Sequence, residues 1–572
     1  MDKVALEKAA RTYLARESHS YFTDDLEKVL AENNWEELED RFYKDLDFGT
    51  GGLRGVIGGG DNRLNPFNIR RATQGLANYV KAQGIKDPAA VIACDSRNFS
   101  DLFSKEAALV LGANGIKTYL FTSLRPTPEL SYAVRQLKAT VGIVVTASHN
   151  PPEYNGYKVY WEDGGQLVPP HDKGVIAEVR KVTDDIKVLT EEEALSSGML
   201  VMIDKEIDEP YLAMVRRYLP RPDLTKSRGG DITVVYTPLH GTGTMLTERL
   251  FGDMGIKIIT VPEQREPDGG FPTVAFPNPE EPAALKMALD LAKKEKARLV
   301  IGTDPDADRI GIAVPDKKGD FVLLTGNQLG TLMGDYLFLT HQEKGTMPPN
   351  PRLVKTIVTT EMQVKVAEKY GAGWYDVLTG FKYIGEKIKD FETTGETYVF
   401  GGEESYGFLI TPEVRDKDAI SAAALTAEMV LYYHSRGMSL LDRLEELWKE
   451  LGYFEETLIS KTIKGVKGAQ IIKEIMADLR ANPPTEIGGI DVVEVRDYQN
   501  QAVLPVPRAE VIQIRLADDT IVTARPSGTE PKIKFYASLR GRPDESLAEA
   551  RADVARRIVG VQAYLATLTN RS

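Results

Sequence analysis

Three aspartates stand at alternate positions in the segment LVIGTDPDADRIGIAV, which runs from Leu299 to Val314. The apolar residues on both sides predict two buried strands, with Asp304, Asp306 and Asp308 in the loop between them. Carboxylates gathered at one centre repel each other unless a cation binds them, and an all-oxygen ligand set favours Mg²⁺ over zinc. The loop therefore predicts a magnesium site. The alternatives are a phosphatase loop with Asp304 as nucleophile, and a solvated acidic turn.

A serine follows another apolar strand in VVTASHNPPEYNGYKVYW, Val144–Trp161. Ser148 could cap a turn, serve as a hydrolase nucleophile with His149 as its base, or carry a group between substrates. No G-x-S-x-G elbow surrounds it. Neighbouring side chains on an extended segment point apart, so we expect His149 to be poorly placed to deprotonate Ser148. A carrier serine needs a metal, a base and a second anion site, and the chain offers candidates for all three.

The segment TARPSGTEPKIKFYASL predicts a phosphate-binding loop without a Walker motif, because a guanidinium, two hydroxyls and an accessible backbone N–H fall within five residues. A plain Pro-Ser-Gly turn is the alternative. The segment FGGEESYGF, Phe400–Phe408, places carboxylates and a serine between glycines, which suits sugar hydroxyls, although a polar turn is an equal alternative.

Composition favours an ordinary soluble enzyme. The 572 residues are 42% hydrophobic and 27% charged, and no apolar run approaches the length that spans a membrane. The net charge of −13 argues against binding to nucleic acid or to an anionic membrane. The single cysteine fits a reducing compartment, and the charged N-terminus is no signal peptide. We expect a cytoplasmic protein with no nucleic-acid and no membrane partner.

The order of segments predicts an α/β fold. Residues 1–45 read as helices, and strand–helix–strand repeats then indicate largely parallel sheets. The last segments read as an α+β module with antiparallel strands. Breaks in composition predict four parts: 1–207 with the helices and the serine loop, 208–322 with the aspartate loop, 323–454 with the GGEES loop, and 455–572 with the RPSGTEP loop.

Four separated motifs, TASHNP, GTDPDADR, GGEES and RPSGTEP, resemble in order and spacing those of the α-D-phosphohexomutases. FGTGGLRG, EYNGYKVY, TPLHGTG, LTGFKYIG and VRDKDA resemble the phosphoglucomutase-2 branch of that family, which includes phosphoglucomutases, phosphopentomutases and glucose-1,6-bisphosphate synthases. The resemblance runs from about Phe48 to Tyr536. It implies three similar mixed α/β domains and a C-terminal α+β domain like the TATA-box-binding protein, arranged around a central cleft.

The resemblance also implies roles for individual residues. Ser148 would be the phosphoserine, with one of its oxygens completing a Mg²⁺ site formed by Asp304, Asp306 and Asp308. Near the transferring phosphoryl group the matching residues are Arg54, His149, Lys158 and Lys382, and either Lys158 or Lys382 would exchange the proton. Substrate contacts are implied for Arg309 beside the metal loop, for Glu403 and Ser405 at the sugar, and for a phosphate-binding set: Arg525, Ser527, Gly528, Thr529 and Lys534. The last of these departs from forms with arginine, and a lysine holds phosphate only as a point charge.

The implied reaction is that of a phosphoglucomutase, in which glucose 1-phosphate becomes glucose 6-phosphate through a sugar 1,6-bisphosphate that is both intermediate and activator. Small sugar phosphates are the expected partners, and the chain is expected to be a monomer or homodimer. A phosphopentomutase, a phosphomannomutase and a sugar-1,6-bisphosphate synthase remain alternatives on the same scaffold. A phosphatase and a catalytically idle sugar-phosphate sensor remain alternatives from other classes.

Overall fold

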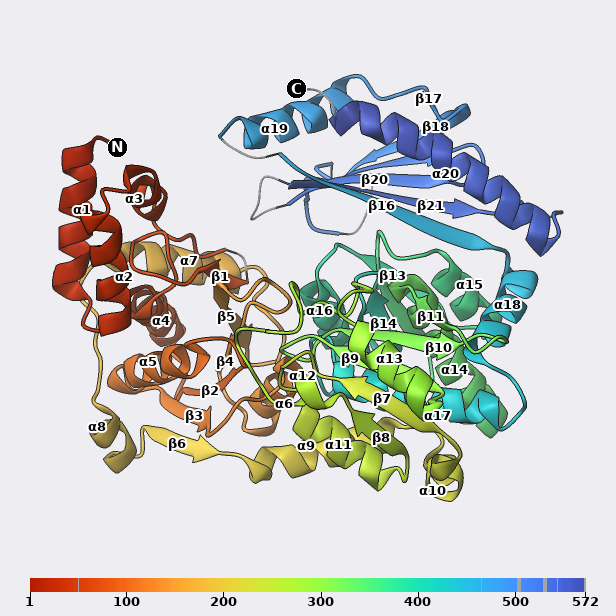
Figure 1. Cartoon of the computed structure of the whole chain (residues 1–572), viewed down its shortest axis with the longest axis horizontal. Helices are drawn as coiled ribbons and strands as arrows, with labels where there is room; N and C mark the ends of the chain where they lie inside the picture. The colour runs from red at the N-terminus through yellow and green to blue at the C-terminus, as the bar shows by residue number, and fades with distance from the viewer. Residues whose placement is uncertain (50, 464–465, 501–505, 528–531, 543, 570–572) are drawn as a thin grey trace. The chain divides into compact units, whose positions relative to one another are not determined.

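The computed structural model describes residues 1–49, 51–463, 466–500, 506–527, 532–542 and 544–569 (Figure 1). Residue contacts divide the chain into two units. Unit 1 comprises Met1–Leu324, Ile384–Thr394 and Gly407–Tyr432, and unit 2 comprises Thr325–Tyr383, Gly395–Tyr406 and Tyr433–Ser572.

Unit 1 begins with three helices, as the composition predicted: α1 (Lys3–Arg16), α2 (Ser20–Ala31) and α3 (Trp35–Phe42). They share an apolar core that includes Leu6, Tyr13, Leu26 and Leu38. Three glycines that follow the first strand pack closely against these helices. At Gly59 there is no room for a side chain, because a Cβ there would stand 2.4 Å from the Phe22 carbonyl oxygen. The glycine-rich stretch is thus explained in part by close packing of these helices.

The first sheet of unit 1 is mixed, with strand order β1-β5-β4-β2-β3-β6. β5 pairs antiparallel with β1 and β4, and the other pairs are parallel. On one face of this sheet, helix α6 packs against Gly142. On the other face, Val141 and Ile143 point into the apolar core that the sheet forms with α4, α5 and α7. The elements are β1 (Gly52–Val56), α4 (Pro66–Ala82), β2 (Ala89–Cys94), α5 (Ser100–Ala113), β3 (Lys117–Phe121), α6 (Thr127–Gln136), β4 (Val141–Val145), β5 (Tyr154–Trp161), α7 (His171–Lys181), α8 (Glu191–Ser196) and β6 (Leu200–Ile203).

The second sheet of unit 1 has the order β11-β10-β9-β7-β8 and carries the aspartate loop between β9 and β10. Its core is formed with α13, whose Ala288 and Ala292 pack among Val235 and Val300. The elements are α9 (Lys205–Tyr218), α10 (Pro222–Arg228), β7 (Thr233–Thr237), α11 (Thr244–Asp253), β8 (Lys257–Thr260), α12 (Pro262–Arg265), α13 (Lys286–Glu295), β9 (Leu299–Thr303), β10 (Ile310–Pro315) and β11 (Phe321–Leu324). Unit 1 also holds β15 (Gly407–Leu409) and most of α17 (Ala419–His434).

Unit 2 starts with a parallel arrangement in which β12 lies between β13 and β14. Helix α14 packs against β14 and α15 packs against β12. The elements are α14 (Gly326–Lys344), β12 (Pro351–Thr356), α15 (Met362–Lys369), β13 (Gly373–Val377), α16 (Phe381–Thr394, shared with unit 1), β14 (Thr397–Glu403) and α18 (Leu440–Leu451).

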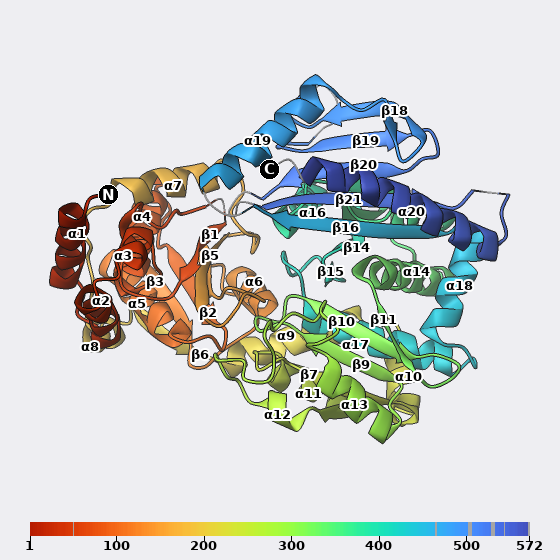
Figure 2. The same cartoon turned by 45° about the horizontal axis from the view of Figure 1, so that its top comes forward.

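The C-terminal part of unit 2 is an antiparallel sheet with strand order β16-β21-β20-β19-β18-β17. Helices α19 and α20 cover the same face of this sheet, where their apolar residues join one core with those of the strands (Figure 2). The elements are β16 (Phe454–Thr462), α19 (Val466–Ala481), β17 (Glu486–Ile487), β18 (Ile490–Asp497), β19 (Ile512–Leu516), β20 (Ile521–Pro526), β21 (Lys532–Arg540) and α20 (Leu547–Thr569).

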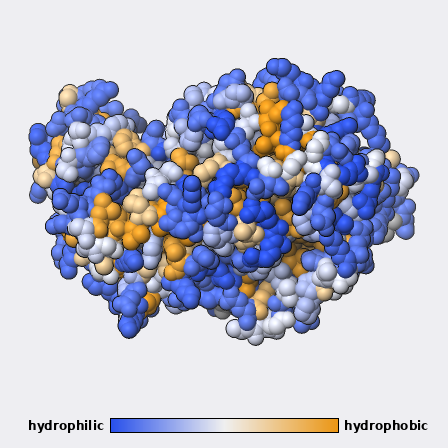
Figure 3. Space-filling model, turned by 90° about the horizontal axis from the view of Figure 1, so that it is seen from below, coloured by the Kyte–Doolittle hydropathy of each residue, from blue (hydrophilic) through white to orange (hydrophobic). Residues whose placement is uncertain are grey.

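All three predicted domain boundaries fall inside regular elements. Helix α9 continues across residues 207 and 208, β11 continues across residues 322 and 323, and β16 continues across residues 454 and 455. Hydrophilic residues dominate the face of the molecule seen in Figure 3. Among the described residues, no helix is both long enough and apolar enough to cross a membrane.

Candidate active site

The three aspartates lie in the tight loop that joins β9 to β10. Thr303 and Ile310 form the last pair of the antiparallel ladder, so the loop closes directly above two buried strands. Ala307 adopts a left-handed conformation with φ of 51°, which lets the chain reverse within the loop. The three carboxylates are at most 1% exposed, and one oxygen of each lies within 4.8 Å of the others. The predicted gathering of charge at one centre is confirmed.

Ser148 follows β4 and faces the same centre. Its Oγ donates a hydrogen bond to Asp304 Oδ2 at 2.7 Å, and the Nδ1 atom of His149 lies 3.1 Å from the same Oγ. The expectation that His149 would point away from Ser148 is therefore wrong. Ser148 has φ of 53°, so the two residues do not lie on an extended segment, and the turn brings both side chains to one side.

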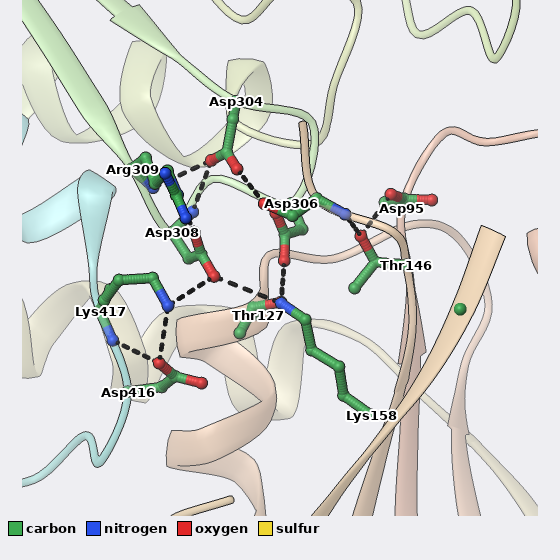
Figure 4. A network of polar contacts seen from close by, with 12 residues as sticks. Asp95, Thr127, Thr146, Lys158, Asp304, Asp306, Asp308, Arg309, Asp416 and Lys417 are labelled. Carbon is green, nitrogen blue, oxygen red and sulfur yellow. Dashed lines mark hydrogen bonds and ion pairs between the residues drawn. The ribbon is translucent and has the colours of Figure 1, made fainter. Parts of the chain in front are cut away.

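Two lysines form ion pairs with Asp306 and Asp308 (Figure 4). Lys158, on β5, places Nζ 2.7 Å from Asp306 Oδ2 and 3.3 Å from Asp308 Oδ2. Lys417, in the segment between β15 and α17, places Nζ 3.0 Å from the same oxygen of Asp308. Asp416, which accepts hydrogen bonds from Tyr160 and Gln166, lies 3.2 Å from Lys417. Residues distant in sequence thus form one buried ionic network.

The network shifts the protonation equilibria of its members in opposite directions. Burial and the charges of Asp306 and Asp308 raise the pKa of Asp304 well above its usual value. Although burial opposes the charged form, Lys417 and Lys158 hold the pKa of Asp308 below its usual value. Burial lowers the pKa of His149 well below the usual range, and nearby arginines add to this effect, so its imidazole is neutral at pH 7. The hydroxyl hydrogen of Ser148 is donated to Asp304, so the contact with His149 is completed by the tautomer that carries its hydrogen on Nδ1 and donates it to Ser148 Oγ.

The donor set of the aspartate loop fits a divalent cation. All three carboxylates converge, and neither histidine nor cysteine is among them. Asp306 Oδ1 is buried and has no hydrogen-bond partner among the described residues. The other oxygen of Asp306 is oriented by Thr127 Oγ1 at 2.8 Å, at the N-terminus of α6. A hard cation with oxygen ligands suits such a site.

The two arginines implied near this centre lie on its borders. Arg54 is exposed on β1, opposite Gly156 of β5. The backbone N–H of Arg309 donates to Asp304 Oδ1 at 2.9 Å, while its guanidinium pairs with Glu280. Its Nε lies 4.0 Å from Asp308 Oδ1. Both belong to unit 1, as do Ser148 and the aspartates.

The remaining predicted residues lie in unit 2. Glu403 ends β14, and its Oε1 accepts a hydrogen bond from the backbone N–H of Gly380 at 2.9 Å. Lys382 is the second residue of α16 and lies over the ring of Tyr383, with Nζ 5.2 Å from its centroid. Ser405 lies in the turn after Glu403, partly exposed. These residues lie at the carboxyl end of β14 or in the segments that directly follow β13 and β14.

The candidate phosphate-binding residues lie on neighbouring strands. Arg525 of β20 and Lys534 of β21 are direct partners in the antiparallel ladder. The backbone N–H of Ser527 donates to the Lys532 carbonyl at 2.7 Å, next to the last ladder pair of Pro526 and Ile533. Gly528 and Thr529 lie outside the described residues.

Glu404 is a charged neighbour of this pair that the sequence reasoning did not single out. Burial and the adjacent Glu403 carboxylate raise its pKa to about 7, while Lys534 and Arg525 act in the opposite direction. Its Oε2 accepts hydrogen bonds from Thr356 and Thr359 at 3.3 and 3.4 Å. Lys417 was missed as well, although it stands in the quoted segment VRDKDA. Only the fold brings either residue to its partners.

Comparison with known proteins places the chain in a family. Models of the phosphoglucomutase/phosphomannomutase α/β/α domains I, II and III match residues 45–185, 209–319 and 325–451. A curated relative, the phosphoglucomutase of Staphylococcus aureus strain MSSA476, is 36% identical over 527 residues, which cover 90% of this chain and 93% of the relative.

Two solved structures share the fold. A putative phosphomannomutase from Thermus thermophilus superposes with a TM-score of 0.67 at 23% identity, covering 90% of this chain and 99% of the other. The exocytosis-sensitive phosphoprotein pp63/parafusin from Paramecium superposes with a TM-score of 0.70 at 18% identity, covering 93% and 96%. The predicted fold class, three α/β/α domains followed by an antiparallel C-terminal domain, is confirmed.

Proposed function

This chain belongs to the phosphoglucomutase/phosphomannomutase family, and on that premise we propose that it is a phosphoglucomutase. It interconverts glucose 1-phosphate and glucose 6-phosphate. Ser148 carries the phosphoryl group between them, and glucose 1,6-bisphosphate is the intermediate. The observation that supports this most is the position of the Ser148 hydroxyl, 2.7 Å from Asp304 within the buried group of three aspartates.

The transfer depends mainly on residues of unit 1. A sugar hydroxyl gives up its proton as its oxygen forms the new bond to phosphorus, and the bond between phosphorus and Ser148 Oγ breaks. The Ser148 oxygen takes a proton from the Lys158 ammonium as it leaves, and the sugar proton goes to Lys382 or to the Lys158 amine so formed. The neutral imidazole of His149, 3.1 Å away, orients the serine oxygen and is able to exchange its proton. The same steps in reverse return the phosphoryl group from the other end of the bisphosphate.

Mg²⁺ is the proposed cofactor, held by Asp304, Asp306, Asp308 and an oxygen on Ser148. When bound, it would neutralise charge on the phosphoryl oxygens. Lys158 and Lys417 compensate the same carboxylates from the protein side. Arg54 and Arg309 add positive charge at the edges of the site, where phosphoryl oxygens develop negative charge.

Residues of unit 2 bind the parts of the sugar that do not react. Glu403 and Ser405 accept and donate hydrogen bonds to sugar hydroxyls. The non-reacting phosphate is bound by a set that combines two cations with hydroxyl and backbone donors: Arg525, Ser527, Gly528, Thr529 and Lys534. The paired positions of Arg525 and Lys534 on adjacent strands support this role.

The contacts of Asp304 favour a carrier serine over an aspartate-based phosphatase. Its Oδ1 accepts the backbone N–H groups of Asp308 and Arg309, and its Oδ2 accepts the Ser148 hydroxyl. Oδ1 is oriented by two N–H groups of its own loop, and Oδ2, the oxygen that a nucleophile would use, faces the hydroxyl of Ser148 on the loop after β4.

A panel of sugar 1-phosphates tests the proposal. The enzyme is incubated with glucose, mannose or ribose 1-phosphate, Mg²⁺ and a trace of the corresponding bisphosphate, and the 6- or 5-phosphate is quantified. Glucose 1-phosphate should be converted with the highest kcat/KM. Ser148→Ala should lose conversion, whereas Ser197→Ala, at an exposed helix end, should retain it. Faster conversion of another sugar would refute the assignment to glucose, and net release of inorganic phosphate would refute the mutase.

A further inference from the structure

The loop between β4 and β5 carries Ser148. The guanidinium of Arg97 packs against this loop and donates hydrogen bonds to four of its backbone carbonyls. Nη1 donates to Pro151 and Tyr154 at 2.8 and 2.9 Å. Nη2 donates to Ser148 at 2.5 Å and also to Asn150. The arginine follows β2 and is only 2% exposed. One side chain from a different strand–loop connection therefore fixes the course of residues 148–154.

Asp95 links Arg97 to Thr146, which directly follows strand β4. Its Oδ2 lies 3.4 Å from Arg97 Nε and accepts the Thr146 hydroxyl at 2.6 Å. Thr146 Oγ1 in turn accepts the backbone N–H of Ser148 at 2.8 Å (Thr146 and Asp95 are labelled in Figure 4). Thr146 thus holds the backbone N–H of Ser148, and Arg97 holds its carbonyl oxygen.

Ser148 needs such restraint because its backbone is strained. A non-glycine residue in the left-handed region costs about 1–3 kcal/mol and persists only where surrounding contacts impose it. The strained conformation is what brings Oγ to 2.7 Å from Asp304. If the residue relaxed to an extended conformation, its side chain would point to the other side of the chain.

We infer that Arg97 is a positioning residue for phosphoryl transfer, acting with Asp95 and Thr146 to hold Ser148 in its left-handed conformation. This inference rests on the proposed function, since it assigns to Arg97 the geometry of the serine that carries the phosphoryl group. In the loop that carries Ser148, Arg97 donates hydrogen bonds only to backbone carbonyls, and its other described neighbours are Asp95 and the ring of Phe271, whose centroid is 5.0 Å away. Its effect on the reaction therefore passes through Ser148.

Arg97→Lys tests the inference most directly, since a lysine keeps the charge but lacks the planar fork that reaches four carbonyls. Displacement of a reacting group by about 1 Å can reduce the rate about 100-fold. We therefore expect kcat to fall between about 10-fold and 100-fold, with KM for glucose 1-phosphate within about twofold, because substrate-binding residues lie elsewhere. A folded Arg97→Lys enzyme with wild-type kcat, or one in which only KM changes, would overturn the inference.

Arg97 is buried, so a second pair of variants decides the case in which Arg97→Lys does not fold. Thr146→Val removes the acceptor for the Ser148 N–H and leaves the arginine intact, while Thr146→Ser keeps the hydroxyl. We expect kcat to fall in the valine variant and to return to near the wild-type value in the serine variant. Equal kcat in both would contradict the positioning role.

Hydrogen exchange separates this inference from the proposed function. In wild-type enzyme without sugar, amides of residues 146–154 should exchange slowly, and in Arg97→Lys or Thr146→Val they should exchange at least tenfold faster. Unchanged exchange would overturn the inference whatever the activity. Loss of the proposed function would instead appear in the wild-type enzyme, as a lack of conversion of glucose 1-phosphate, with the exchange difference still present.

Discussion

Replacement of Lys158 by methionine should destabilise the metal-free protein and make it depend on Mg²⁺. The ammonium lies 2.7 Å from Asp306 Oδ2 and 3.3 Å from Asp308 Oδ2, and its side chain is 12% exposed. At an effective dielectric constant of 20, a pair of charges at the shorter distance attracts by about 6 kcal/mol. Desolvation of the ammonium offsets part of this, and removal of one partner from a buried ion pair costs about 3–5 kcal/mol.

Mg²⁺ should recover much of that loss in Lys158→Met, because it supplies positive charge at the same carboxylates. At a concentration 100 times its Kd, a ligand that binds only the native state adds about 2.7 kcal/mol. The ammonium no longer competes with the cation, so we also expect Mg²⁺ to bind the variant about tenfold more tightly than it binds wild type.

Urea unfolding in chelator and in Mg²⁺, with calorimetric titration of Mg²⁺, measures these effects. Lys181→Met is the matched control: its side chain is 68% exposed and pairs with Glu178 on one helix, where a surface ion pair contributes at most about 1 kcal/mol. Equal stability of Lys158→Met and wild type in chelator, or no stabilisation of either by Mg²⁺, would refute the electrostatic account of this site.

Three further outcomes are expected. Thorough chelation should abolish turnover, and Mg²⁺ should restore it better than Zn²⁺ or Ca²⁺; activity that survives chelation would contradict a metal at the aspartate loop. Arg525→Ala should lower kcat/KM about 10-fold to 100-fold, since a charge-assisted hydrogen bond to phosphate contributes about 1.5–3 kcal/mol, and unchanged steady-state constants would remove Arg525 from the phosphate site. Glu404 has a pKa of about 7, raised by burial and by Glu403, so it gains negative charge near Arg525 and Lys534 as pH rises from 6 to 8. KM for glucose 1-phosphate should therefore rise with pH in wild type and rise less in Glu404→Gln; identical pH profiles would exclude this effect.

The sequence indicated which side chains gather at the aspartate loop better than it indicated their local geometry. The alternation of Asp304, Asp306 and Asp308 between two apolar runs was enough to predict a loop that gathers carboxylates, because a short connection between buried strands leaves those side chains few directions. Ser148 was recognisable by the same reasoning, as a hydroxyl at the exit of a buried strand.

The relation between Ser148 and His149 could not be read in this way. It depends on the sign of one backbone angle, and a serine carries no local signal for the left-handed conformation that it adopts. That conformation is imposed by residues distant in the chain, with Arg97 contributing from the neighbouring loop.

Contacts between residues that are far apart in the sequence could not be predicted either. Lys417 and Asp308 are more than a hundred positions apart and pair at 3.0 Å, and Thr127 orients Asp306 from the start of a helix in a different domain. A charged or hydroxyl residue in a polar segment gives no indication of such a partner until the fold is known. The helical N-terminus and the alternation of strands and helices, by contrast, are local patterns, and they were predicted correctly.

Peptide mapping of the purified enzyme shows whether Ser148 carries the phosphoryl group. The enzyme is incubated with glucose 1,6-bisphosphate, quenched in acid and digested, and the phosphorylated residue is identified by tandem mass spectrometry. We expect phosphate on Ser148 that is lost on incubation with excess glucose 1-phosphate or glucose 6-phosphate and is absent from Ser148→Ala. Phosphate on Asp304, or an active enzyme with no phosphate on Ser148 before or after the bisphosphate, would contradict this expectation.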